Sequence, residues 1–139
     1  MNYAMIRYLI GWMLGVESVF LLLPALTAIL YQEHVVSAYL GAAAICLAFA
    51  VLFSRKKPAN NRFYAREGFV PVALCWIVLA VPGSLPFLFS GEIPSVVDAL
   101  FETISGFTTT GATILSDVES MSHAALLWRS LTHWVGGMG

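Results

Sequence analysis

Charged residues are scarce in this 139-residue chain, and their scarcity excludes an ordinary soluble domain. Asp, Glu, Lys and Arg make up 11% of the sequence, whereas soluble domains carry about a quarter. Hydrophobic residues account for 59%, and the mean hydropathy is +0.82. The net charge is −1, and the chain has no basic patch of the kind that nucleic-acid binding requires. The composition therefore predicts a protein that lies in a lipid bilayer and binds no nucleic acid.

Cysteine is equally rare, which excludes a disulfide framework. The two cysteines, Cys46 and Cys75, each lie alone within an apolar stretch. Neither has the spacing of a metal-binding motif, so both are interpreted as small packing residues. We expect no metal or organic cofactor.

Long apolar stretches are abundant and divide the chain into four blocks, residues 6–31, 35–53, 69–89 and 123–139. A helix needs about 20 apolar residues to cross the hydrocarbon core, so the first three blocks predict an all-α, polytopic membrane protein. The first block is too long for a signal peptide, and no convincing cleavage site follows it. The fourth block is still apolar at the last residue, so we expect the chain to be the front part of a longer protein.

The distribution of basic residues predicts the orientation of the chain. Five Lys and Arg residues crowd the 55–66 link between the second and third blocks, and Arg7 lies at the start of the first block. The 32–34 link holds none. Because short basic loops stay in the cytoplasm, the amino terminus and the 55–66 link are placed inside. The third span then delivers residues 90–94 to the outer face.

A shorter apolar segment follows the third span. Residues 95–107 show the apolar periodicity of a helix, and Ser95 with Asp98 resembles a capping box. About a dozen residues rise only about 18 Å, which is about half of a bilayer. We therefore predict a re-entrant helix that enters from the outer face and ends near the membrane centre.

The sequence GFTTTGATI, residues 106–114, interrupts the helical pattern at that point. Threonine and glycine are poor helix formers, and irregular backbone at membrane depth is tolerated only where protein or water satisfies it. Gly111 can adopt a positive φ that keeps successive carbonyls directed at one axis, as in filters whose carbonyls replace the hydration shell of potassium. Residues 108–113 are therefore predicted to bind a monovalent cation through oxygen atoms. Hydroxyl groups that add ligands or anchor the loop are supplied by Thr108, Thr109, Thr110 and Thr113.

These features together resemble the first pore unit of the Trk/Ktr/HKT superfamily of potassium transporters, and most closely the bacterial TrkH-type pore subunit. The resemblance covers essentially the whole chain. It is carried by the two leading spans and by GSLPF, FETISGFTTTGAT and WRSLTHWVGGMG, which begin at residues 83, 101 and 128. It implies two leading helices (1–66) and one of an expected four pore units (67–139). The unit's parts would be a span (69–89), the re-entrant pore helix (95–107), the filter loop (108–113) and the start of a second, truncated span (123–139).

The resemblance also implies a function and a set of site residues. The filter would consist of Thr109, Thr110, Gly111 and Ala112, with potassium at the Thr109 and Thr110 carbonyls and with Thr108 and Thr113 flanking it. Glycine at position 111 goes with potassium selectivity in this superfamily. The implied function is potassium uptake across the bacterial cytoplasmic (inner) membrane by a homodimer of full-length subunits, with a soluble nucleotide-binding regulatory subunit on the cytoplasmic side. Channel-like transport and transport coupled to protons or sodium both stay open.

Three charged residues lie in the interior of the apolar segments, away from their ends. Glu102 and Arg129 are at or near membrane depth, where a buried charge is costly and is usually paired or faces water. One hypothesis is that they pair and brace the filter from behind. The alternative is that each reaches interfacial water. For Glu17, we expect a partner within the bundle or water in a crevice.

Several glycines favour close helix packing. Gly11 and Gly15 form a GxxxG pair within the first block. Gly136, Gly137 and Gly139 could let the last helix pack tightly or bend, and packing is the favoured interpretation.

Two other classes of function are open to this sequence. An intramembrane serine protease could use Ser105 with His133, but no oxyanion-hole motif is visible. A non-transporting membrane adaptor made of packed helices would have no use for a half-helix followed by a carbonyl-aligning loop. The sequence therefore favours a transporter and not an enzyme.

Overall fold

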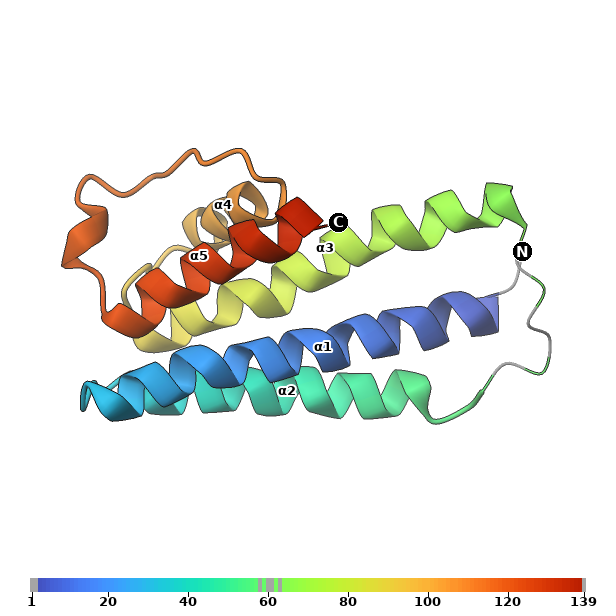
Figure 1. Cartoon of the computed structure of the whole chain (residues 1–139), viewed down its shortest axis with the longest axis horizontal. Coiled ribbons are helices and arrows are strands. Elements are labelled where there is room, and N and C mark those ends of the chain that lie inside the picture. Colours follow the sequence, from blue (N-terminus) through green and yellow to red (C-terminus); the bar gives the residue numbers. More distant parts are fainter. Residues whose placement is uncertain (1–2, 58, 60–61, 63, 139) are drawn as a thin grey trace.

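The chain folds into helices, and a long loop joins α4 to α5 (Figure 1). The computed structural model describes residues 3–57, 59, 62 and 64–138. Within these residues it contains no strand, and its helices are α1 (Tyr3–Leu30), α2 (Val36–Ser54), α3 (Ala65–Ser90), α4 (Val96–Phe107), the 3-10 helix η1 (Val118–Ser120) and α5 (His123–Met138). The helices α1, α2 and α3 are each long and apolar enough to cross a membrane. The predicted all-α, polytopic class is therefore confirmed.

Helices α1 and α2 form an antiparallel hairpin with a close backbone contact. A methyl group at Gly11 would lie 2.9 Å from the Ser54 backbone nitrogen and 3.1 Å from the Ala50 carbonyl oxygen. One turn further along α1, Gly15 faces the Ala50 side chain at an ordinary distance of 3.8 Å. The GxxxG pair thus serves close helix packing, as predicted, because any side chain at Gly11 would push the hairpin apart.

The main core cluster joins all five α-helices, α1 to α5. Its largest members, Leu21, Tyr39, Phe87 and Trp128, are at most 1% exposed. The Trp128 indole Nε1 donates a hydrogen bond of 2.9 Å to the carbonyl oxygen of Gly83. Because helix association in a membrane depends on van der Waals packing and hydrogen bonds, this contact fixes α5 against α3.

The connection from α3 to α4 sets the start of the short helix. Helix α3 ends at Ser90 and is capped by Gly91, whose φ of 75° is left-handed, and α4 begins after Ser95. The capping box expected from Ser95 and Asp98 is wrong, because the Ser95 side chain makes no capping hydrogen bond. Residues 94–97, on either side of the first residue of α4, are exposed, so solvent can satisfy the first backbone N–H groups of the helix. Asp98 remains in the first turn, where it suits the helix dipole.

Two carboxylates from distant turns hold the start of α5. Glu33, between α1 and α2, accepts hydrogen bonds from the backbone N–H groups of His123 (2.8 Å) and Ala124 (3.2 Å). The His123 ring Nδ1 lies 2.9 Å from the same carboxylate. Glu92, between α3 and α4, accepts a bond of 2.7 Å from the backbone N–H of Ser122. Anionic groups stabilise a helix amino terminus, so these contacts tie the α1–α2 and α3–α4 connections to the start of α5.

The Glu33 contact predicts a stability change in acid. Burial raises the pKa of the Glu33 carboxyl, but hydrogen bonds from His123 and Ala124 outweigh it and leave the pKa lowered. The stabilisation is therefore complete above the unfolded-state pKa and is lost as the pH falls through the lower folded-state pKa. We expect Glu33→Gln to lower the free energy of unfolding by about 1 kcal/mol at neutral pH. In the variant, this free energy should decline less steeply between about pH 5 and pH 3 than in the wild type. Thermal unfolding of both proteins as a function of pH measures this, and parallel curves would contradict it.

Candidate functional site

Helix α4 ends in a Schellman motif immediately before the threonine run. The Thr109 N–H donates to the Gly106 carbonyl (3.0 Å), and the Thr110 N–H donates to the Ser105 carbonyl (2.9 Å). Thr109 itself has a φ of 56°, in the left-handed region that this motif requires. Glycine usually occupies this position, and a non-glycine residue there costs roughly 1–2 kcal/mol. A strained residue of this kind is a pointer to a functional segment.

The loop after α4 has free backbone oxygens. Among the described residues, no group donates a hydrogen bond to the carbonyl oxygens of Thr109, Thr110 or Gly111. All three residues are exposed, and Gly111 has a φ of 79° with no neighbouring atom within 4 Å of a methyl group placed on it. The Ala112 carbonyl differs, because it accepts a 2.6 Å hydrogen bond from the Ser105 hydroxyl. Three consecutive carbonyls are therefore available to a ligand, and the fourth is held by α4.

The threonine hydroxyls make hydrogen bonds within the loop and to α4. The Thr108 hydroxyl donates to the Ile104 carbonyl (2.6 Å) and lies 2.8 Å from the Thr110 hydroxyl. The Thr109 hydroxyl donates to the Thr108 carbonyl (2.7 Å). In this arrangement the hydroxyl groups anchor the loop and the carbonyls stay unoccupied.

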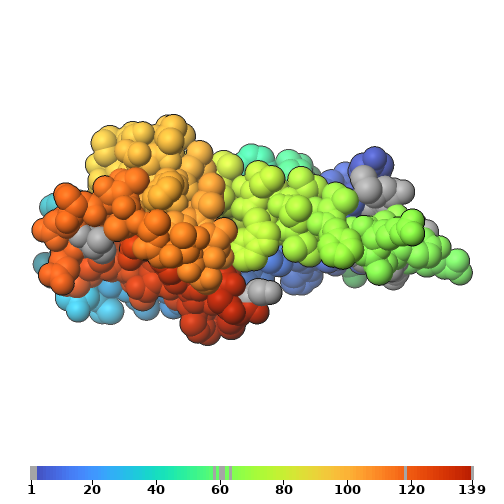
Figure 2. Space-filling view, turned by 90° about the horizontal axis from the view of Figure 1, so that it is seen from above, coloured from blue at the N-terminus to red at the C-terminus, as the bar shows by residue number. Residues whose placement is uncertain are grey.

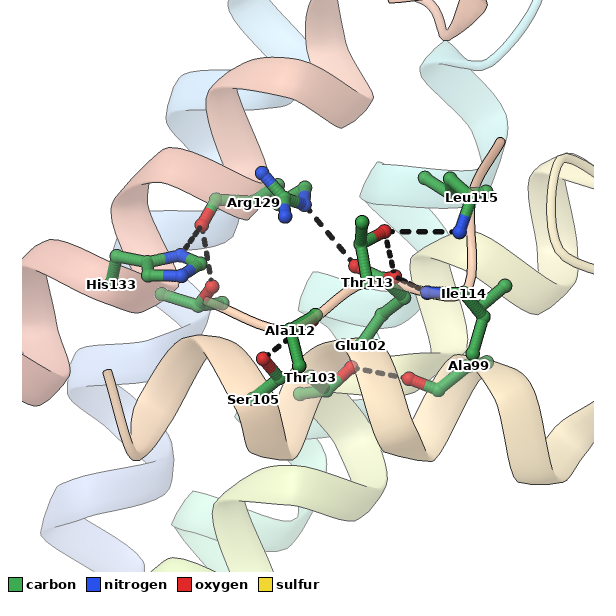
Figure 3. A network of polar contacts seen from close by, with 11 residues as sticks. Ala99, Glu102, Thr103, Ser105, Ala112, Thr113, Ile114, Leu115, Arg129 and His133 are labelled. Atoms are coloured by element: carbon green, nitrogen blue, oxygen red, sulfur yellow. Dashed lines mark hydrogen bonds and ion pairs between the residues drawn. The ribbon is translucent and has the colours of Figure 1, made fainter. Parts of the chain in front are cut away.

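Glu102 connects α4, the loop and α5 (Figure 3). Its side chain is buried, with 2% exposure of the residue. One carboxylate oxygen accepts hydrogen bonds from the Thr113 hydroxyl and from the Ile114 N–H (2.8 Å). The other accepts a 3.1 Å bond from Arg129 Nε on α5. The Thr113 hydroxyl also accepts a 3.0 Å bond from the Leu115 N–H. The far end of the loop is thus fixed by a carboxylate that has three partners.

Helix α5 lies in backbone contact with the end of α4. A methyl group at Gly136 would overlap the Phe107 carbonyl oxygen and lie 2.7 Å from the carbonyl carbon. A methyl group at Gly106 would lie 2.8 Å from Cβ of Thr132. Gly137 has only an ordinary contact, at 3.9 Å from the Thr109 methyl carbon. Gly136 therefore serves packing, as favoured from the sequence. Figure 2 shows α4 and the loop that follows it on one face of the molecule, beside the end of α5.

Comparison with known proteins decides the family. The family model described as TrkH, cation transport protein, matches residues 34–139. The chain belongs to the TrkH family. It is 37% identical to the Trk system potassium uptake proteins TrkH of Salmonella typhimurium and Escherichia coli K12, with 100% of this chain and 29% of each relative covered. The crystal structure of the potassium transporter TrkH from Vibrio parahaemolyticus matches with a TM-score of 0.92 at 35% identity, covering 100% of this chain and 30% of that one.

Membership in the TrkH family has two direct consequences. With three helices able to cross a bilayer, the chain is part of an integral membrane protein. The family consists of cation transport proteins and not of enzymes, as expected from the sequence. The chain spans 29% of the length of the first curated relatives.

The geometry also speaks against the protease alternative in this TrkH-family chain. The Ser105 hydroxyl donates to the Ala112 carbonyl, and the His133 ring Nδ1 lies 2.9 Å from the Arg129 carbonyl oxygen. Among the described residues, the serine and the histidine make no hydrogen bond with each other. The paired nucleophile and base that peptide cleavage requires are therefore not formed.

Glu17 is a buried acidic side chain to which the described residues offer no hydrogen-bond partner. It is 5% exposed, and both of its carboxylate oxygens lack a hydrogen bond. A methyl group at Gly83 would lie 2.9 Å from one of these oxygens. A cavity of about 30 Å³, lined also by Phe107, Trp128 and Thr132, adjoins the carboxyl group. The expected protein partner is thus not found, whereas the cavity has room for a water molecule.

Proposed function

We propose that the full-length protein takes up potassium across the bacterial cytoplasmic membrane and that this chain supplies one side of its selectivity filter. The observation that carries the proposal is the row of three unbonded carbonyl oxygens at Thr109, Thr110 and Gly111. Potassium filters use carbonyl oxygens to replace the ion's hydration shell. The relatives in Salmonella typhimurium and Escherichia coli are named potassium uptake proteins, which supports the same ion here.

The short helix α4 suits a cation at this position. Its 12 residues span about 18 Å, which fits a re-entrant helix that ends near the membrane centre. The carboxyl end of a helix carries about half a negative charge, and the threonine run begins at that end. We therefore assign α4 the role of a pore helix whose dipole favours a dehydrated monovalent cation.

The backbone conformation of the loop favours carbonyls on a common side. In an extended strand, successive residues face opposite sides. Thr109 and Gly111, two residues apart, both have positive φ, so the loop departs from the alternation of an extended strand and successive carbonyls can be directed at one axis. Four such loops around one axis would complete a ring, so this unit supplies a quarter of it. Ala112, whose carbonyl is held by Ser105, then marks the end of the ion-binding row.

The orientation and the partners follow from the same proposal. The basic 55–66 link and the amino terminus lie in the cytoplasm. As the resemblance implies, two full-length subunits form a homodimer, and a nucleotide-binding regulatory subunit docks on this cytoplasmic side.

Replacing Gly111 by valine tests the filter assignment. Nothing lies within 4 Å of a methyl group at this position, so the substitution causes no clash within the chain and acts through the positive φ. A β-branched residue disfavours that conformation and would rotate the adjoining carbonyls. We expect potassium uptake in a potassium-transport-deficient bacterial strain to fall at least about tenfold at equal protein level, a loss of about 1.4 kcal/mol in transition-state stabilisation.

Gly91→Val provides a matched control. Gly91 also has a positive φ, 75°, and also has nothing within 4 Å of an added methyl group, but it lies in the α3–α4 turn. The same backbone strain is therefore applied away from the loop, and uptake should stay near the wild-type rate. Equal uptake by Gly111→Val and Gly91→Val would remove the filter assignment and favour a non-transporting adaptor.

A further inference from the structure

An apolar groove lies between the α1–α2 hairpin and α3. In Figure 1 the hairpin and α3 diverge toward the side of the 55–66 link. The groove has a volume of about 330 Å³, and all of its lining side chains are hydrophobic. Its walls include Ile45, Phe49 and Phe53 of α2 and Ile77, Val81 and Leu85 of α3. The groove is open to the surroundings, because Phe49 is 48% and Ile77 is 65% exposed.

The groove ends at a cluster of positive charge. It follows α2 for about 12 Å, from Ile45 to Phe53, one residue before the helix ends. Three exposed basic residues come next, Arg55, Lys56 and Lys57. The sequence from Ile45 to Arg66 contains no Asp or Glu. A basic cluster at the membrane surface attracts anionic lipid headgroups.

We propose that this groove binds one acyl chain of an anionic phospholipid, with its phosphate held by Arg55, Lys56 and Lys57. The lipid comes from the leaflet on the side of the 55–66 link. Both walls are membrane spans, so the groove lies at hydrocarbon depth, where an apolar site takes up hydrocarbon and excludes water. An acyl chain joined to an anionic headgroup matches both features of this place, the apolar walls of the groove and the basic residues that follow the end of α2.

The headgroup contact is tested by lipid binding to the purified full-length protein in detergent. Native mass spectrometry measures the dissociation constants of phosphatidylglycerol and of phosphatidylcholine with matched acyl chains. Each basic residue near an anionic group contributes about fivefold in affinity, so the triple variant R55Q/K56Q/K57Q should lose up to roughly 100-fold for phosphatidylglycerol and little for phosphatidylcholine. Arg66→Gln, an exposed basic residue at the start of α3, serves as the control and should change neither constant. Equal affinity for the two lipids in the wild type would overturn the headgroup assignment.

The acyl-chain contact is tested by filling the groove. Ile77→Trp should weaken the binding of both lipids at least about tenfold, because the indole occupies the space of the chain. Leu52→Trp is the matched control, since Leu52 is 57% exposed on α2 and does not line the groove. If Ile77→Trp does not fold, Val81→Trp takes its place, because Val81 lines the same wall and is 54% exposed. Unchanged lipid binding in a folded groove-filling variant would show that lipid binds elsewhere or that another segment covers the groove, and either result overturns the proposal.

Discussion

Replacing Gly136 by alanine is expected to abolish potassium uptake by the full-length protein. The added methyl group would overlap the Phe107 carbonyl oxygen and approach the carbonyl carbon to 2.7 Å. Both are backbone atoms of the last residue of α4, so no side-chain rotation can relieve the overlap. Helix α5 must move away from α4, and the start of the threonine loop moves with it. We expect a loss of about 3 kcal/mol in the free energy of unfolding, at the upper end of the cost of overpacking.

Gly137→Ala is the control for this substitution. It makes the same chemical change one residue further along α5, where a methyl group would lie an ordinary 3.9 Å from its nearest neighbour, the Thr109 methyl carbon. Alanine is the better helix former by about 1 kcal/mol, so this variant should be as stable as the wild type or slightly more stable. Thermal unfolding and potassium uptake are measured for both variants. If Gly136→Ala behaves like Gly137→Ala, the backbone contact between α4 and α5 is not needed for transport.

Replacing Glu102 is expected to have the second largest effect. Glu102→Ala removes the acceptor of the Thr113 hydroxyl, the Ile114 N–H and Arg129 Nε at once. The loss of one member of a buried ion pair costs about 3–5 kcal/mol, and we expect the lower end because the Arg129 side chain is 21% exposed. The far end of the loop is then no longer held. Potassium uptake should fall more than tenfold, and the preference for potassium over sodium should fall with it.

The conservative variant separates a positioning role from a purely structural one. Glu102→Gln keeps an acceptor for the Ile114 N–H but loses the charge that faces Arg129. We expect a folded protein with reduced selectivity and intermediate uptake. The double variant Glu102→Gln/Arg129→Gln should recover part of the loss, because the unpaired charge is removed. Glu119→Gln, an exposed carboxylate in η1, is the control. Unchanged selectivity and uptake in Glu102→Gln would end the hypothesis that this pair braces the filter.

Local sequence determined the secondary structure because the relevant signals are short-range. The hydropathy and length of the first three blocks predicted three spans, and α1, α2 and α3 are such helices. The threonine–glycine run predicted an interruption, and the backbone leaves the helical conformation after Phe107. The capping box predicted at Ser95 was wrong, because its hydrogen bond is not decided by the neighbouring residues alone. A capping motif has an alternative partner in solvent at an exposed helix start, so its residue pattern alone does not decide the hydrogen bond.

Within the candidate site, too, the residue pattern did not decide the individual hydrogen bonds. The sequence brought Glu102 and Arg129 together as a hypothesis, because two opposite charges in an apolar setting have few other partners. It did not indicate the hydrogen bond from Ser105 to the Ala112 carbonyl, which separates Ala112 from the three residues before it. It also did not indicate the left-handed conformation of Thr109, because glycine and not threonine is the usual residue there.

The amino-acid sequence by itself determined that this protein is helical, lies in a membrane and carries a threonine–glycine loop after a half-length helix. Hydropathy, helix propensity and charge distribution act over one turn or one span, and each can be read from neighbouring residues. Only the tertiary structure decided which atoms meet, as in the contact of Gly136 with Phe107 and the hydrogen bonds from the start of α5 to Glu33. These contacts join residues 29 and 90 positions apart, and their geometry depends on how whole helices pack.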